Sequence, residues 1–206
     1  MRSRLLLASA TVAVVSLAAC SDINAPASVR HGLTAELSAS LSRSGAATVN
    51  VLERNKPLDA DAVASATIGP NGGAIRLSDA GFTLIVPRGA VASPTNFTVA
   101  AVPGSLVAYE FEPHGMTFAV PLVAVQDLRG TSSHGNSVSP LTLFAGYFRN
   151  AGEIDNAGSR ATIHEAADVD SHGNSNGDSQ GGEGKKGKSV TFPIFHFSGY
   201  LVAVRS

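Results

Sequence analysis

The residues best suited to chemistry lie near the C-terminus, in the run VTFPIFHFSGYLVAV. His196 and Ser198 stand two residues apart there, and Gly199 follows the serine. A serine hydroxyl is a nucleophile, and an imidazole, with an ordinary pKa of about 6.5, suits the general base that activates it. Side chains two residues apart share one face of a strand, so the pair is expected to meet. Gly199 would permit a bulge or strained turn beside it.

Two further stretches contain residue types that ligate metals. In HEAAD, residues 164–168, His164 lacks the second histidine of the zinc motif H-E-x-x-H, which in any case requires a helix. DVDSHGNSNGDS resembles a calcium loop in part, but a serine stands where the bidentate glutamate belongs. We therefore predict no metal site and no cofactor. The alternative is weak calcium binding by Asp168, Asp170, Asn174 and Asn176.

The N-terminus, MRSRLLLASATVAVVSLAACSD, reads as a leader. Arg2 and Arg4 precede an uncharged apolar run of 15 residues, shorter than the roughly 20 that a membrane span needs. The run ends in LAAC, which resembles the lipobox of bacterial lipoproteins, whose cysteine thiol takes up a diacylglycerol. The expectation is a signal peptide at 1–19 and a membrane anchor on lipidated Cys20. Ser21 in place of aspartate favours, by analogy, an outer-membrane lipoprotein facing the periplasm or exterior.

Composition favours a turn-rich β protein. The chain has 21 glycines, no tryptophan and only 15% charged residues. Once Arg2 and Arg4 leave with the leader, 13 basic residues remain against 16 acidic ones, a net charge of −3. Nucleic-acid binding therefore has no electrostatic support. Because Cys20 is the only cysteine, no intrachain disulfide is available and packing must hold the fold.

Residues 20–60 are expected to form a flexible tether. They are mostly small and polar, and the i, i+4, i+8 spacing of Leu33, Leu37 and Leu41 allows a short amphipathic helix within them. The tether would space the folded part of the protein from the membrane surface.

Residues 61–206 are predicted to form one antiparallel β-sandwich domain. Turn signals such as GPNGG and PRG recur, and between them apolar residues fall at every second position, as Phe82, Leu84 and Val86 do in FTLIV. Pro121 lacks a backbone donor, so its strand should lie at an edge or carry a bulge. The stretch at about 171–188 is rich in Gly, Ser and Asn, and it is predicted to be a mobile insert because it has too little apolar surface to fold.

Several of these pieces together resemble the ZU-five domain, the module of ankyrins, netrin receptors and the death-domain protein PIDD. The resemblance rests on the Gly72–Gly73 turn, the VPRGAV run, the P-x-G-x-x-F step from Pro113 to Phe118, and the closing HFSGYLVAV. It covers about residues 66–130 and 189–206. It implies a β-sandwich used mainly for protein–protein contacts.

The same resemblance implies a reaction for the C-terminal pair. In PIDD-like members a His-x-Ser tripeptide cleaves its own chain. Here Ser198 would attack the carbonyl carbon of Phe197 in an N→O acyl shift, and His196 would accept the proton. Cleavage would free only residues 198–206, which would stay paired in the sheet. The sequence therefore predicts no catalytic residue, with cleavage after Phe197 by His196 and Ser198 as an alternative.

The function predicted from the sequence is that of a lipid-anchored cell-envelope protein with a non-enzymatic β-sandwich that binds a protein partner. Its partners are the membrane, reached through lipidated Cys20, and a protein that the sequence does not identify. Two alternatives stay open: an autoproteolytic module that cleaves the Phe197–Ser198 bond, and a structural envelope spacer.

Overall fold

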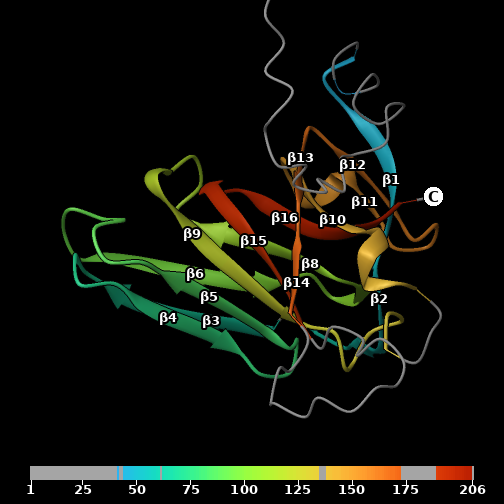
Figure 1. Cartoon of the computed structure of the whole chain (residues 1–206), viewed down its shortest axis with the longest axis horizontal. Helices are drawn as coiled ribbons and strands as arrows, with labels where there is room; N and C mark the ends of the chain where they lie inside the picture. Colours follow the sequence, from blue (N-terminus) through green and yellow to red (C-terminus); the bar gives the residue numbers. More distant parts are fainter. Residues whose placement is uncertain (1–40, 42–43, 61, 135–137, 173–188, 206) are drawn as a thin grey trace, which may run out of the picture. The chain divides into compact units, whose positions relative to one another are not determined.

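Antiparallel strands make up most of the chain that the structure describes (Figure 1). The computed structural model describes residues 41, 44–60, 62–134, 138–172 and 189–205, which lie within one compact unit at 31–206. The strands are β1 (Ala47–Val51), β2 (Glu53–Leu58), β3 (Ala62–Ile68), β4 (Gly73–Leu77), β5 (Phe82–Val86), β6 (Thr95–Ala101), β7 (Gly104–Leu106), β8 (Ala108–Glu112), β9 (Thr117–Asp127), β10 (Leu143–Phe148), β11 (Ile154–Asp155), β12 (Arg160–Ile163), β13 (Glu165–Asp168), β14 (Asp170–His172), β15 (Ser189–His196) and β16 (Gly199–Val204). Two single-turn 3-10 helices, η1 (Pro140–Thr142) and η2 (Ala151–Glu153), join strands.

The strands form two large sheets and one two-stranded sheet. The nine-stranded sheet has the order β11-β12-β1-β16-β8-β6-β3, and β10 branches from it by pairing with β16 and β13. The five-stranded sheet has the order β14-β15-β9-β5-β4, and β2 pairs with β7. The last two strands, β15 and β16, belong to different sheets, so the chain changes sheet between them.

The two large sheets share one apolar core. Phe82 and Leu84 from the five-stranded sheet, and Phe97 and Phe111 from the nine-stranded one, are all fully or almost fully buried in it. Phe82 also stacks on Tyr109 of the opposite sheet, with 4.0 Å between the ring centroids. Side chains of the two layers therefore interdigitate, as in a β-sandwich. The predicted all-β antiparallel fold is confirmed.

A second, smaller core lies on the other side of β16. Phe144 and Phe148 from β10 pack there with Val49, Ile163 and Leu201. β16 faces both cores because its residues are buried on both faces, which agrees with its nearly continuous apolar sequence. This strand is the central structural element of the C-terminal region.

The predicted boundary between tether and domain at residue 60 is wrong. β1 pairs with β12 and β16, and Leu52, between β1 and β2, is completely buried. The five-residue alternation in ATVNV is a strand pattern that the small, polar composition around it conceals. Leu41, the last residue of the proposed helix, packs against the second core, and the rest of that helix lies outside the described residues.

β9 carries the bulge that Pro121 predicts. β9 lies inside the five-stranded sheet, and its pairing with β15 shifts register between Ile194 and His196, opposite the segment that holds the proline. The shift turns Val120 outward, where it is 39% exposed, although a regular two-residue period would place it on the buried face with Phe118. Of the proposed insert, residues 171–172 form the end of β14, and residues 173–188 lie outside the described part of the chain.

Candidate functional sites

The C-terminal corner is where β15 of the five-stranded sheet gives way to β16 of the nine-stranded one (Figure 1). β15 ends at His196 and β16 begins at Gly199, so Phe197 and Ser198 form the whole connection. The Phe197 ring is 1% exposed and packs against Phe111, with 5.3 Å between centroids. The core thus fixes the connection in place.

His196 and Ser198 do not meet, contrary to the sequence-based expectation. His196 Nε2 lies 3.1 Å from a carboxylate oxygen of Glu165, and its ring packs edge-on against Tyr147. The Ser198 hydroxyl is directed elsewhere, and its single proton has two acceptors within reach: the Arg149 carbonyl at 3.3 Å and a different histidine. The period-two argument fails because the strand stops at His196 and the chain turns into the other sheet.

A different histidine faces Ser198. His114 follows Pro113 in the loop between β8 and β9, and its Nδ1 lies 3.4 Å from Ser198 Oγ. Its Nε2 lies 3.0 Å from Glu112 Oε1, and its backbone N–H donates to Glu112 Oε2 at 2.9 Å. A carboxylate on Nε2 favours the tautomer with the proton there, which leaves Nδ1 free to accept from the serine. Serine, histidine and glutamate thus form a chain of polar contacts.

Sequence reasoning missed His114 because it lies 84 residues from Ser198 along the chain. The available signal was the Pro-His-Gly step at 113–115, where a rigid turn followed by glycine holds a histidine in one place.

The loop that carries His114 also holds the peptide bond before Ser198. The Gly115 N–H donates to the Phe197 carbonyl at 2.9 Å, and the Phe197 N–H donates to the Met116 carbonyl at 2.7 Å. Gly115 has a φ of +75°, which glycine adopts without steric penalty. A hydrogen bond to the carbonyl that Ser198 would attack supports charge on its oxygen, as an oxyanion-hole donor does.

The strain expected beside Ser198 is not found. Among the described residues, Ser159 is the only non-glycine with positive φ, and Gly199 does not have positive φ either. Gly199 serves packing: a Cβ there would lie 2.2 Å from Cε2 of the buried Phe148 ring. The corner therefore combines a nucleophile, an acceptor and a polarised carbonyl in a relaxed backbone.

The metal-ligand candidates lie in strands. Residues 160–168 form β12, β13 and the single residue between them, so the helix that a zinc motif requires is absent there. His164 Nε2 contacts Glu153 at 2.8 Å and its Nδ1 contacts the Gly45 carbonyl at 2.9 Å. Asp168 pairs with Arg205 at 2.6 Å, and Asp170 lies in β14. Within the described residues no group of three or more potential metal ligands gathers.

Several predicted sites lie outside the described residues. They are Cys20 with the signal peptide at 1–19, and Asn174 and Asn176 of the calcium alternative. Among the residues that the structure describes, no helix is long and apolar enough to cross a membrane.

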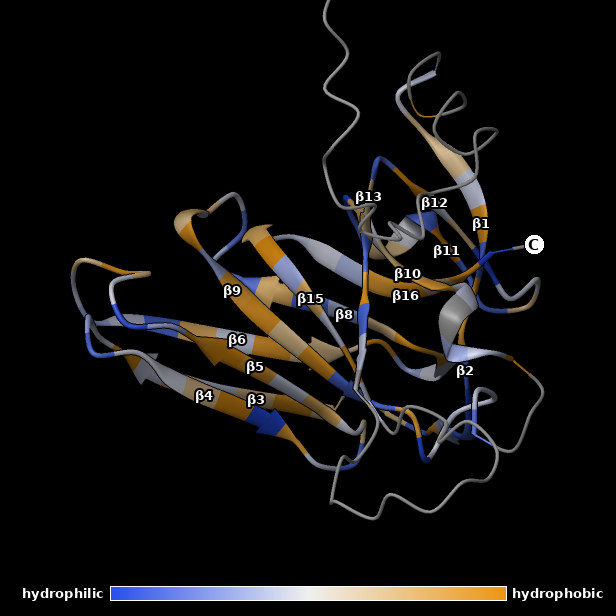
Figure 2. Ribbon diagram, viewed as in Figure 1, coloured by the Kyte–Doolittle hydropathy of each residue, from blue (hydrophilic) through white to orange (hydrophobic). Residues whose placement is uncertain are grey.

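The outer face of the five-stranded sheet is apolar. Ala74, Ile85, Val123 and Pro193 form one row across β4, β5, β9 and β15. Phe195, two residues further along β15, is 52% exposed, and Ile85 is 39% exposed. Figure 2 shows hydrophobic colour along most of β5 and the middle of β9, whose last residues are hydrophilic. We call these five residues the apolar outer face.

No protein-family model matches the chain, and no curated protein matches it at a significant level.

Proposed function

We propose that the protein is a lipid-anchored envelope protein whose β-sandwich binds a partner protein through the apolar outer face. The observation that carries the proposal is the row of Ala74, Ile85, Val123 and Pro193 on a side of the sheet away from the core. An antiparallel sheet normally presents polar residues on the side that it does not pack on. Large contiguous exposed apolar patches usually mark interaction sites.

The chemistry of the face indicates the partner. In the next row of the sheet the three middle positions, Thr83, Val125 and Thr191, are uncharged, and charge stands at the two ends of that row, at Arg76 on β4 and Asp170 on β14. A complementary surface therefore presents apolar side chains without buried charge, because an unpaired charge at an interface core costs desolvation free energy. We take the occupant to be such a surface on another protein.

Two sequence features support the rest of the proposal. LAAC at 17–20 supports the lipid anchor on Cys20, and the ZU-five resemblance supports a role in protein–protein contacts. Metabolic labelling with a fatty acid tests the anchor. The wild-type chain should carry the label and appear in the membrane fraction, and Cys20→Ala should lose both the label and the membrane association.

Site-specific crosslinking in cells tests the face. A photoreactive amino acid at Ile85 should give one adduct of defined mass, and the second substitution Val123→Lys should abolish it. The matched control places the probe at the exposed Thr67 of β3, in the other sheet, and should give no adduct. An adduct unaffected by Val123→Lys, or equal adducts from both probe positions, would refute the face. An adduct with the mass of two copies of this chain would show that the face binds a second copy of the protein instead of a different partner.

The second candidate function is self-cleavage after Phe197, and one observation favours it. Gly115 N–H holds the Phe197 carbonyl while His114 faces Ser198. On this geometry His114 accepts the Ser198 proton, Oγ bonds to the Phe197 carbonyl carbon, and the C–N bond breaks as His114 returns that proton to the Ser198 nitrogen. Water then hydrolyses the ester, which leaves a carboxylate on Phe197 and restores the Ser198 hydroxyl. Ser198→Ala and His114→Gln should both keep the chain intact, whereas His196→Gln should not alter cleavage. A wild-type chain that stays intact under denaturing conditions eliminates this candidate.

A further inference from the structure

A buried arginine in β2 lacks partners for two of its three guanidinium nitrogens. Arg54 is 6% exposed, and its Nη1 donates to the carbonyls of Leu106 and, at 3.4 Å, Val102. Its Nε and Nη2 are both buried and have no hydrogen-bond partner. Among the described residues no carboxylate forms an ion pair with Arg54. A buried cation without a counter-ion is unfavourable, so this arrangement needs an explanation.

The unpartnered edge of Arg54 has the shape of an anion site. Nε and Nη2 project side by side from one edge of the planar guanidinium, and two parallel N–H groups match the two oxygens of a carboxylate. The rest of the group is fixed, because Nη1 is bonded to backbone carbonyls and the guanidinium lies over the Tyr109 ring, 5.5 Å from its centroid. The edge is therefore preorganised.

A cavity of about 510 Å³ adjoins this arginine. Arg54 is part of its wall, together with residues 56–59 of β2 and the chain after it, the 78–81 turn, and the β9 end at 126–131. A volume of this size lies within the range of small-molecule sites, roughly 300–1,000 Å³. The cavity shares no residue with the apolar outer face.

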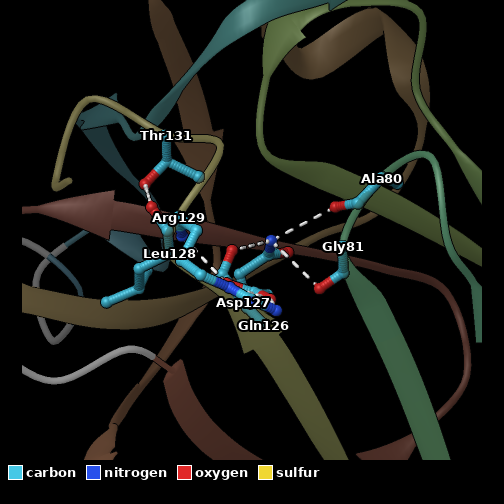
Figure 3. A network of polar contacts seen from close by, with 7 residues as sticks. All are labelled: Ala80, Gly81, Gln126, Asp127, Leu128, Arg129 and Thr131. Atoms are coloured by element: carbon cyan, nitrogen blue, oxygen red, sulfur yellow. Dashed lines mark hydrogen bonds and ion pairs between the residues drawn. The ribbon is translucent and has the colours of Figure 1, made fainter. Parts of the chain in front are cut away.

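Hydrogen bonds hold the far wall of the cavity rigid (Figure 3). Gln126 is 1% exposed, and its Nε2 donates to the carbonyls of Ala80 and Asp127 at 3.2 and 2.8 Å. Its Oε1 accepts from the Tyr109 hydroxyl at 2.5 Å. This network fixes the 78–81 turn against the end of β9 and ties both to the ring under Arg54. Its own donors and acceptors are satisfied internally, so this network does not compete with a ligand for the arginine edge.

We propose that this cavity binds a small molecule through a carboxylate group held side-on by Nε and Nη2 of Arg54. A carboxylate suits the site because its two oxygens match the two parallel N–H groups, and Asp59, Asp79 and Asp127 in the wall offset Lys56 and Arg129, so the charge of the cavity does not favour a dianion. The Asp127 charge is already met by Arg129. Since both arginine nitrogens are covered, binding requires a small displacement of the wall. This inference does not depend on the proposed protein-binding face.

Benzoate and its neutral analogue benzamide provide the test, with the mature ¹⁵N-labelled protein in detergent micelles. The Nε–H signal of Arg54 is recorded during a titration with each compound. We expect benzoate to shift this signal in a saturable way and benzamide to leave it in place. No saturable shift with benzoate, or equal shifts with both compounds or with sodium chloride, would overturn the proposal.

Variants then test the side-on pairing between the carboxylate and the two nitrogens of Arg54. Arg54→Lys keeps the charge but loses the paired donors, and we expect it to weaken benzoate binding at least about tenfold. The matched control is Arg88→Gln, an exposed arginine outside the cavity, which should bind benzoate as the wild type does. If Arg54→Lys binds benzoate equally well, the side-on pairing is wrong. If that variant does not fold, the wild-type titration alone decides.

Discussion

Replacing Gly199 by alanine adds one methyl group at the start of β16, and the structure sets its cost. The new Cβ would lie 2.2 Å from Cε2 and 2.3 Å from Cζ of Phe148. Carbon atoms in contact normally lie about 3.5–4 Å apart, so one side must move by more than about 1 Å. β16 cannot retreat, because Gly199 is paired with Phe148 of β10 on one side and Glu110 of β8 on the other. Overpacking of this kind costs about 1–3 kcal/mol, and we expect the upper end of that range.

The assay is urea denaturation of the chain from residue 21 onward, followed by far-ultraviolet circular dichroism because the protein has no tryptophan. Phe148→Leu, which removes the clashing ring atoms, should cost about 1–2 kcal/mol alone through loss of packing. The double variant with Gly199→Ala should be destabilised by at least about 1 kcal/mol less than the sum of the two single-variant costs. A free energy of unfolding for Gly199→Ala within about 0.5 kcal/mol of wild type, or strictly additive variants, would refute the packing account.

Three further predictions concern stability. Burial alone would raise the pKa of Glu153, but the Arg149 N–H and the His164 imidazole outweigh it and lower that pKa below 4.5. Its stabilisation is therefore present above the unfolded pKa and is lost as pH falls through the folded value, so Glu153→Gln should lower the free energy of unfolding more at pH 6 than at pH 3. An equal loss at both pH values would contradict this. Tyr109→Phe leaves Gln126 Oε1 without its donor and should cost about 1–3 kcal/mol in urea titration; a neutral effect would show that the Tyr109–Gln126 hydrogen bond contributes nothing. A chain starting at residue 61 lacks β1 and β2 and should show no cooperative thermal transition, whereas one starting at residue 44 should; two equal melting curves would restore the boundary predicted from the sequence.

The fold class was predictable because alternation is a local signal. FTLIV at 82–86 and TNFTVAA at 95–101 place apolar residues at every second position, and both segments are strands with one buried face. Pro121 marked the β9 bulge for an equally local reason, its missing N–H. The first strand, at 47–51, was not predicted because its composition is similar to that of the predicted tether before it. The position of Val120 escaped because a bulge reverses the faces of the residues beside it.

The candidate site was predictable only in part, because its contacts are long-range. Ser198 was identified, but the histidine that faces it comes from the β8–β9 loop, and that juxtaposition depends on the change of sheet after His196. The period-two argument would place His196 beside Ser198 only if one strand continued through both. Likewise, the residues next to Arg54 in the sequence do not indicate that its charge is buried, or that it lies beside a cavity formed by segments from three parts of the chain.

The mass of the mature protein, purified from membranes and measured intact under denaturing conditions, tests the central claim most directly. A lipid-anchored interaction module predicts one species that begins at Cys20, carries acyl chains and is continuous across the Phe197–Ser198 bond. A species that begins upstream of Cys20 and carries no lipid would contradict the anchor. A separate fragment that begins at Ser198 would contradict the non-enzymatic module and leave self-cleavage as the function.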